Sequence, residues 1–147
     1  MEDIRRYIKE LRTLEKGLKK TIKKVILKGN REIIDAIKSR LYGTGIDGDG
    51  RYLGNYHPNT IKRWKKTTMH ISLLNTGDWY SGIFVTTRGN IVTIMSRDKK
   101  NSMLIEEYSE NILALNKNEQ LLIIEEPIDK EIQKIIDSFA DIKIEFK

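Results

Sequence analysis

The amino-acid sequence predicts an α+β fold in a single domain over residues 1–147. Three observations predict it: apolar residues recur every three or four positions through the first forty residues, two mid-chain segments have the composition of strands, and Pro127 precedes a further set of apolar residues at helical spacing. We expect residues 1–42 to be helical, 43–78 to form a loop with a short basic helix, and 79–147 to form a sheet and a C-terminal helix. One modest core suits this length.

The first helix is predicted over about residues 2–28. Its apolar stripe consists of Ile4, Tyr7, Ile8, Leu11, Leu14, Leu18, Ile22, Val25 and Ile26, and lysines and arginines fill the other faces. Gly29 and Asn30 interrupt the pattern, and Asn30 is a suitable N-cap for a second helix that continues to Leu41. The two stretches form either two helices or one long helix interrupted near residue 29.

A glycine-rich loop is predicted at 43–57. Its glycines permit backbone geometries that other residues avoid; they are Gly43, Gly45, Gly48, Gly50 and Gly54. Pro58 then opens a short helix with Ile61 and Trp64 on one side and basic residues around them. We predict that Ile61 and Trp64 are buried anchors of this helix.

An antiparallel β-hairpin is predicted at about 79–96. The chain turns at 75–78, and the segments 79–87 and 91–96 then have the composition of strands joined at 88–90. The second strand alternates Ile91, Thr93 and Met95 with Val92 and Ile94, a pattern that suits a sheet with one wetter face.

The last third of the chain contains several short patterns. The segment 103–108 favours a short helix or a strand. Asn116 and Glu119 have the spacing of a capping box, whereas the apolar run at 121–124 favours a strand, so both alternatives stay open.

A C-terminal helix is predicted at about 128–140. Pro127 is suited to the start of a helix. The predicted buried stripe consists of Ile128, Ile132, Ile135, Ile136 and Phe139. Alternation of Ile142, Ile144 and Phe146 predicts a terminal strand.

Charge is unevenly distributed along the chain. Residues 1–100 carry 22 lysines and arginines against 10 acids, a net charge of +12, whereas residues 101–147 carry 5 against 11, a net charge of −6. The basic part favours nucleic-acid contact, because lysine and arginine neutralise phosphates whatever the base sequence. Opposite charges on two parts also favour head-to-tail contact between identical subunits, which can close into a ring. A solvated surface of uneven charge is the third interpretation.

The composition argues against several classes of protein. No stretch approaches the roughly 18–20 uninterrupted apolar residues of a transmembrane helix, and the N-terminal residues lack the apolar block of a secretory signal. The chain has no cysteine, which excludes disulfides and thiolate zinc sites. Because it has no apolar stretch long enough to span a membrane, we expect no membrane association.

No residues have the pattern of a catalytic or metal site. Asp47 and Asp49 lie in a tight loop, but a calcium loop of the EF-hand type would need glycine where Tyr52 stands and also lacks its closing glutamate. His57 and His70 have no companion ligands for zinc. The sequence also has no glycine-rich nucleotide loop and no serine with an activating histidine. We expect a protein with no enzymatic activity, metal or cofactor.

The turn Leu74–Tyr80 leads directly into the predicted hairpin, and it follows a basic N-terminal helix and a loop of sequence GIDGDGRYL. This order resembles small virion proteins of tailed bacteriophages, in which an L-x-x-T/S-G-x-L/F/Y turn precedes a β-hairpin and a C-terminal helix closes the fold. The family includes tail-completion, neck and head–tail connector subunits, which form rings around the DNA exit channel and have no catalytic site.

The resemblance implies a structural subunit of the virion, with copies of itself, other neck, tail or portal proteins and packaged DNA as partners. The predicted docking residues in the loop and turn are Asp47, Asp49, Arg51, Tyr52, Thr76, Asp78, Trp79 and Tyr80. The predicted nucleic-acid-facing residues are Lys19, Lys20, Lys23, Lys24, Lys62, Arg63, Lys65 and Lys66. The alternative hypotheses are a stand-alone nucleic-acid-binding module that uses this basic set, and a metal-dependent enzyme centred on Asp47 and Asp49.

Overall fold

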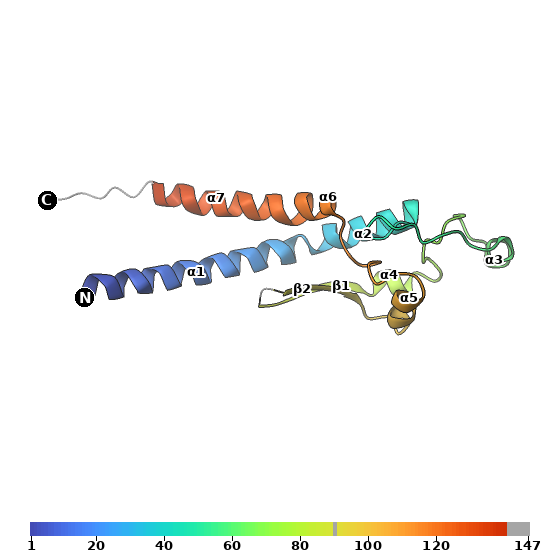
Figure 1. Ribbon diagram of the computed structural model, residues 1–147, viewed down its shortest axis with the longest axis horizontal. Helices are drawn as coiled ribbons and strands as arrows, with labels where there is room; N and C mark the ends of the chain where they lie inside the picture. Colours follow the sequence, from blue (N-terminus) through green and yellow to red (C-terminus); the bar gives the residue numbers. More distant parts are fainter. Residues whose placement is uncertain (90, 141–147) are drawn as a thin grey trace.

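The structure, a computed structural model, describes residues 1–89 and 91–140. It is an elongated α+β molecule in which two long helices project from a compact part (Figure 1). We call α1 (Glu2–Lys28) and α7 (Glu126–Ala140) the helical arm. The remaining elements form the body, which begins with α2 (Asn30–Thr44).

α1 and α2 form a nearly continuous helix that is interrupted at Gly29. The Gly29 amide donates to the Val25 carbonyl and the Ile33 amide to the Gly29 carbonyl, both at 2.9 Å, so hydrogen bonds run through the junction. The prediction of Asn30 as an N-cap was wrong, because Asn30 is the first residue of α2 and no side chain caps either helix. α2 ends at Gly45, whose φ of 64° favours glycine.

The β-hairpin consists of β1 (Ile83–Arg88) and β2 (Ile91–Ser96), which pair antiparallel with Ile83 opposite Ser96. The predicted start at residue 79 was wrong, because α4 (Asp78–Ser81) precedes the hairpin. A strand would point the neighbouring side chains of Trp79 and Tyr80 to opposite faces, whereas the helical turn allows both to be buried. The prediction of one wetter face is confirmed, since alternate residues of β2 are exposed.

The predicted capping box is present, and it begins a helical run from residue 117 to 140. Asn116 and Glu119 exchange side chain-to-backbone hydrogen bonds of 2.8 and 2.9 Å. α6 (Lys117–Gln120) continues through a π-helical turn, η1 (Leu121–Glu125), into α7. The strand alternative at 121–124 was therefore wrong, and the wide turn lies just before Pro127, which lacks an amide donor.

Two of the shorter helices correspond to predicted segments. α3 (Pro58–Trp64) is the predicted basic helix, and α5 (Asn101–Glu107) resolves the 103–108 segment as helix. The predicted terminal strand at 142–146 and the turn residue Asn90 lie outside the described residues.

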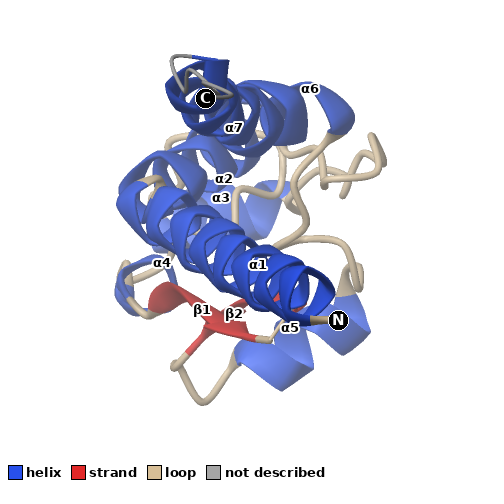
Figure 2. Ribbon diagram, turned by 90° about the vertical axis from the view of Figure 1, so that its left-hand side faces the viewer, coloured by secondary structure: helices blue, strands red, loops and turns tan. Residues whose placement is uncertain are grey.

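The core lies where α2, the hairpin and the segment 112–115 meet. Figure 2 shows three layers, with α7 on one side of α1 and α2 and the hairpin on the other. The buried apolar side chains form one cluster: Ile26, Ile33, Ile37, Leu41, Leu73, Trp79, Tyr80, Ile83, Val85, Ile112, Leu113 and Leu115. One member comes from α1, and it lies next to the body.

The helical arm buries less than its sequence predicts. α1 and α7 diverge toward their outer ends, and α1 extends beyond the described part of α7 (Figure 1). Ile136, predicted to be buried, is 54 % exposed, and the Phe139 side chain lies outside the described residues. The apolar stripes of both helices therefore continue past the point where the fold covers them.

Candidate interaction surfaces

Asp47 fixes the glycine-rich loop to the C-terminal half of the body. Its carboxylate accepts hydrogen bonds from the Asp49 amide at 2.9 Å, the Arg51 amide at 2.8 Å and the Ser109 hydroxyl at 2.6 Å. The side chain is buried, so the prediction that Asp47 belongs to a docking surface was wrong. A buried carboxylate needs such partners, and here they are used to hold the loop in place.

The same contacts determine the charge of Asp47. Burial raises the pKa of its carboxyl, but the hydrogen bonds from Ser109, Arg51 and Asp49, together with the nearby charge of Arg40, outweigh burial and hold the pKa below its ordinary value. Asp47 therefore stabilises the fold as an anion.

Arg40 makes a second connection to this loop. Its guanidinium donates to the Ile46 carbonyl at 3.0 Å, to the Ala114 carbonyl at 2.7 Å and to the carboxylate of Glu119. Gly48 fits against the same segment, because a Cβ there would lie 2.3 Å from the Ala114 carbonyl oxygen. These contacts hold the loop in place at several points. Of the predicted docking residues in this loop, Asp49, Arg51 and Tyr52 remain exposed.

The predicted docking turn divides into exposed and buried residues. Thr76 and Asp78 are exposed, and the Thr76 hydroxyl donates to the Asp78 carboxylate at 2.7 Å. Trp79 donates to Asn101 Oδ1 at 2.9 Å, and the Tyr80 hydroxyl donates to the Ser72 carbonyl. Burial, followed by the influence of neighbouring tyrosines, raises the Tyr80 pKa. Trp79 and Tyr80 are core residues, so their prediction as docking residues was wrong.

A small hollow of about 230 Å³ lies beside this turn. Its lining includes Tyr56, Lys66, Thr76, Trp79, Lys100 and Met103. Lys66 is committed to the fold here, since its ammonium donates to the Leu74 carbonyl at 2.6 Å and lies 5.0 Å from the Tyr56 ring centroid.

α3 forms a basic tip at the end of the molecule opposite the helical arm (Figure 1). Trp64 is 60 % exposed, so the prediction of a buried anchor was wrong; Ile61 is half-buried. The Arg63 guanidinium lies 5.4 Å from the Trp64 ring centroid, and Lys62 and Lys65 are exposed. An exposed tryptophan among cations is a suitable surface for polyanions or for aromatic groups.

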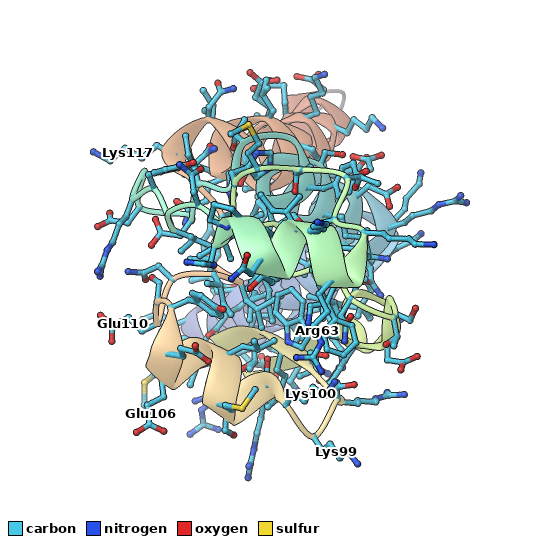
Figure 3. The ribbon with its side chains drawn as sticks, turned by 90° about the vertical axis from the view of Figure 1, so that its right-hand side faces the viewer. Arg63, Lys99, Lys100, Glu106, Glu110 and Lys117 are labelled. Atoms are coloured by element: carbon cyan, nitrogen blue, oxygen red, sulfur yellow. The ribbon has the colours of Figure 1, made fainter. Side chains whose placement is uncertain are left out.

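Lys99 and Lys100, which were not among the predicted nucleic-acid-facing residues, lie at this end of the molecule. Figure 3 looks onto the tip and shows Lys99 and Lys100 on the same side as Arg63, whereas Glu106 and Glu110 lie on the other side. The adjacent lysines were visible in the sequence. Lys100 and Lys66 line the same hollow, so the fold brings the two segments together although the hairpin separates them along the chain.

The predicted nucleic-acid-facing residues do not form one surface. Lys19 and Lys23 line a hollow with the hairpin residues Thr87 and Val92, whereas Lys24 lies near Glu131 of α7. All three belong to α1, which is separated from α3 by the length of α2 (Figure 1). Lys20 is also exposed on α1. The basic set is therefore split between the arm and the tip.

An uncovered apolar surface lies on the outer half of α1. Ile4, Tyr7 and Leu11 are 63 %, 69 % and 56 % exposed, and Ile8 is 45 % exposed. Their spacing of three and four residues places them on one face of the helix. We call these four residues the outer stripe. Contiguous apolar surface of this kind marks interaction sites.

The described residues contain no group of three potential metal ligands from His, Cys, Asp and Glu, and no helix among them is long and apolar enough to span a membrane. Both histidines contact the fold: His57 Nδ1 accepts from the Asn59 amide at 3.2 Å at the start of α3, and His70 Nε2 lies 2.6 Å from the Tyr42 carbonyl.

Comparisons with protein-family models, curated proteins and solved structures found no match for this chain.

Proposed function

We propose that this protein is a non-enzymatic structural subunit that assembles with copies of itself into a ring in the neck, head–tail or tail-completion region of a bacteriophage particle. The observation that carries the proposal is the outer stripe, an apolar helix face that projects from the body and that the described residues leave exposed. The Leu74–Tyr80 turn before a hairpin, which resembles that of phage connector proteins, supports the position in a virion.

Exposure of the outer stripe to water has a cost in free energy. Each apolar side chain left in water forgoes about 1.5–3 kcal/mol that burial would provide. Four such residues on one helix face are a large loss for a domain that is stable by only about 5–15 kcal/mol. Assembly recovers this free energy, and a subunit of a particle is permanently assembled. The basic tip at the other end then remains available for DNA or for another ring.

Native mass spectrometry of the intact protein tests the proposal. We expect one discrete oligomer of more than two copies, and electron microscopy of that species should show a closed ring. Substitution of two outer-stripe residues, as in Ile4→Ser/Leu11→Ser, should shift the mass to the monomer. A matched control is Met69→Ser/Ile91→Ser, which removes two exposed apolar side chains outside the stripe. A strict monomer at every concentration would refute the proposal.

A nucleic-acid-binding module is the second candidate, and the exposed Trp64 beside Arg63 favours it. Stacking on a base and phosphate contact by the surrounding lysines would both be independent of base sequence. Binding of single-stranded and duplex DNA, measured from 50 to 200 mM salt, tests this candidate. We expect that Lys62→Gln/Arg63→Gln/Lys65→Gln flattens the salt slope, whereas Lys19→Gln/Lys20→Gln/Lys23→Gln preserves it if the tip is the binding surface.

A further inference from the structure

We propose that the outer stripe of one copy docks into the hollow between α7 and the α1–α2 junction of a second copy. This inference rests on the proposed function and deepens it, because it assigns the two surfaces that join neighbouring subunits. The surfaces differ, so the contact is head-to-tail, and repetition of the same contact gives a ring when the rotation between neighbours closes.

The acceptor hollow has a volume of about 500 Å³ and lies along α7. Val25, Gly29, Ile123 and Pro127 contribute apolar surface to it. Charged side chains complete the lining: Lys28, Glu32, Lys130, Glu131, Lys134 and Asp137. The lining therefore combines apolar surface with three basic and three acidic side chains, and such a combination is usual in a protein–protein contact.

The charge of the donor identifies its partner as a protein surface. Residues 1–16 carry five lysines and arginines against four acids, a net charge of +1, whereas residues 17–28 carry five lysines and no acid. Mixed charges around an apolar stripe are typical of a helix that packs on another helix. A helix that contacts phosphates would instead resemble residues 17–28, which carry lysines and no acid.

Charge also selects α7 over α1 within the second copy. α1 carries ten lysines and arginines against four acids, a net charge of +6, and residues 17–28 account for five of these six charges, so this basic half of a neighbouring α1 does not attract a donor of net charge +1. α7 carries four acids against two lysines, a net charge of −2. Complementary charges fix which surfaces meet and suppress the wrong pairing. The donor stripe of α1 therefore meets α7 of its neighbour.

Geometry excludes the same contact within one chain. Gln133 of α7 and Val25 of α1 line the same hollow, and Ile8 lies seventeen residues before Val25 on the same helix. At a rise of about 1.5 Å per residue, Ile8 is roughly 25 Å from Val25 along α1, and α1 and α7 diverge toward their outer ends (Figure 1). Ile8 is therefore out of reach of Gln133 in the same chain, since a disulfide spans at most roughly 7 Å between Cα atoms. A disulfide between positions 8 and 133 must therefore join two copies.

The absence of cysteine from the natural chain makes the experiment unambiguous. Ile8→Cys/Gln133→Cys is introduced into the intact protein, oxidised, and resolved on a denaturing gel. We expect a ladder of covalent oligomers that extends to the mass of the native ring. A mixture of the two single variants should give covalent dimers and no higher species, because each copy then carries half of the contact.

The matched control is Ile91→Cys/Gln133→Cys, in which the first cysteine replaces an isoleucine of the hairpin that is more exposed than Ile8; it should give no ladder. If native mass spectrometry shows a ring but the Ile8/Gln133 pair gives no ladder, the docking mode is refuted and the ring remains. Covalent dimers from Ile8→Cys alone would show that α1 pairs with α1, which also refutes it. A monomer by native mass refutes the proposed function itself.

Discussion

The two halves of the long N-terminal helix have similar apolar periodicity but opposite environments. In α2, Ile33, Ile37 and Leu41 are completely buried against the hairpin. In the outer half of α1, Tyr7 and Leu11 are more than half exposed. The difference shows that the period of a helix tells which face is apolar, whereas the surrounding chain decides whether that face is covered. On our interpretation, α2 is covered by this chain and α1 by another copy.

The largest expected effect comes from removing a covered side chain of α2. Ile37→Ala should lower the free energy of unfolding by about 2–5 kcal/mol, because it leaves a cavity in a fully packed core. Leu11→Ala, the matched change in α1, should alter the stability of the dilute monomer by less than about 0.5 kcal/mol. Urea denaturation at low protein concentration measures both. Equal losses of stability in the two variants would contradict the difference in burial between α2 and the outer half of α1.

The next effect concerns the pinned loop. Asp47→Asn should destabilise the fold by about 1–3 kcal/mol at pH 6, because it removes a buried anion that three donors satisfy. The pKa of Asp47 is lowered in the folded protein, so its contribution is fully present above the ordinary carboxyl pKa of about 4 and is lost as the pH falls through the folded value.

Denaturation of the Asp47→Asn variant and the natural protein from pH 6 to pH 2 checks this sign. The stability gap should be constant down to about pH 4 and should narrow below it. Asp49→Asn, an exposed neighbour in the same loop, is the control and should leave stability unchanged within about 0.5 kcal/mol. A gap that widens at low pH would contradict the assigned charge of Asp47.

A smaller effect is expected on assembly when one outer-stripe residue is truncated. Leu11→Ala should weaken self-association by about 1–2 kcal/mol, which corresponds to roughly a tenfold change in the dissociation constant. Analytical ultracentrifugation over a dilution series measures it. Ile91→Ala, on the exposed face of β2, should leave the dissociation constant unchanged; equal weakening by both would indicate non-specific association.

The smallest effect on stability is expected at the basic tip. Trp64→Ala should change the free energy of unfolding by less than about 0.5 kcal/mol, because the indole is mostly exposed. Thermal unfolding of the two proteins measures this change. Trp79→Ala provides the contrast, since removal of the buried indole should cost about 3–5 kcal/mol. A large loss of stability for Trp64→Ala would mean that the indole is buried in a contact that the described fold does not contain.

The regular elements could be predicted from the sequence because local patterns determine them. The helical period, the Asn116–Glu119 capping box and the alternation in β2 each depend on residues that are close along the chain. The start of β1 could not be predicted, since the burial of Trp79 and Tyr80 depends on partners far away, including Ser72 and Asn101.

The candidate surfaces were harder to predict than the fold. A glycine-rich loop with two aspartates has the composition of a mobile docking loop, yet Asp47 is pinned by Ser109, which lies 62 residues later. The basic-aromatic segment predicted a buried Trp64, and the fold instead leaves it exposed. The amphipathic pattern of α1 was correct, but no local signal indicates how far the body extends along a helix.

Hydrogen exchange along α1 of the intact protein tests the central claim most directly. At concentrations where the protein assembles, the amides of residues 4–11 should be protected, and dilution to the monomer should release them while the amides of α2 stay protected. Exchange of residues 4–11 that is the same at every concentration, in a protein that native mass shows to be assembled, would contradict the claim that another copy covers the outer stripe.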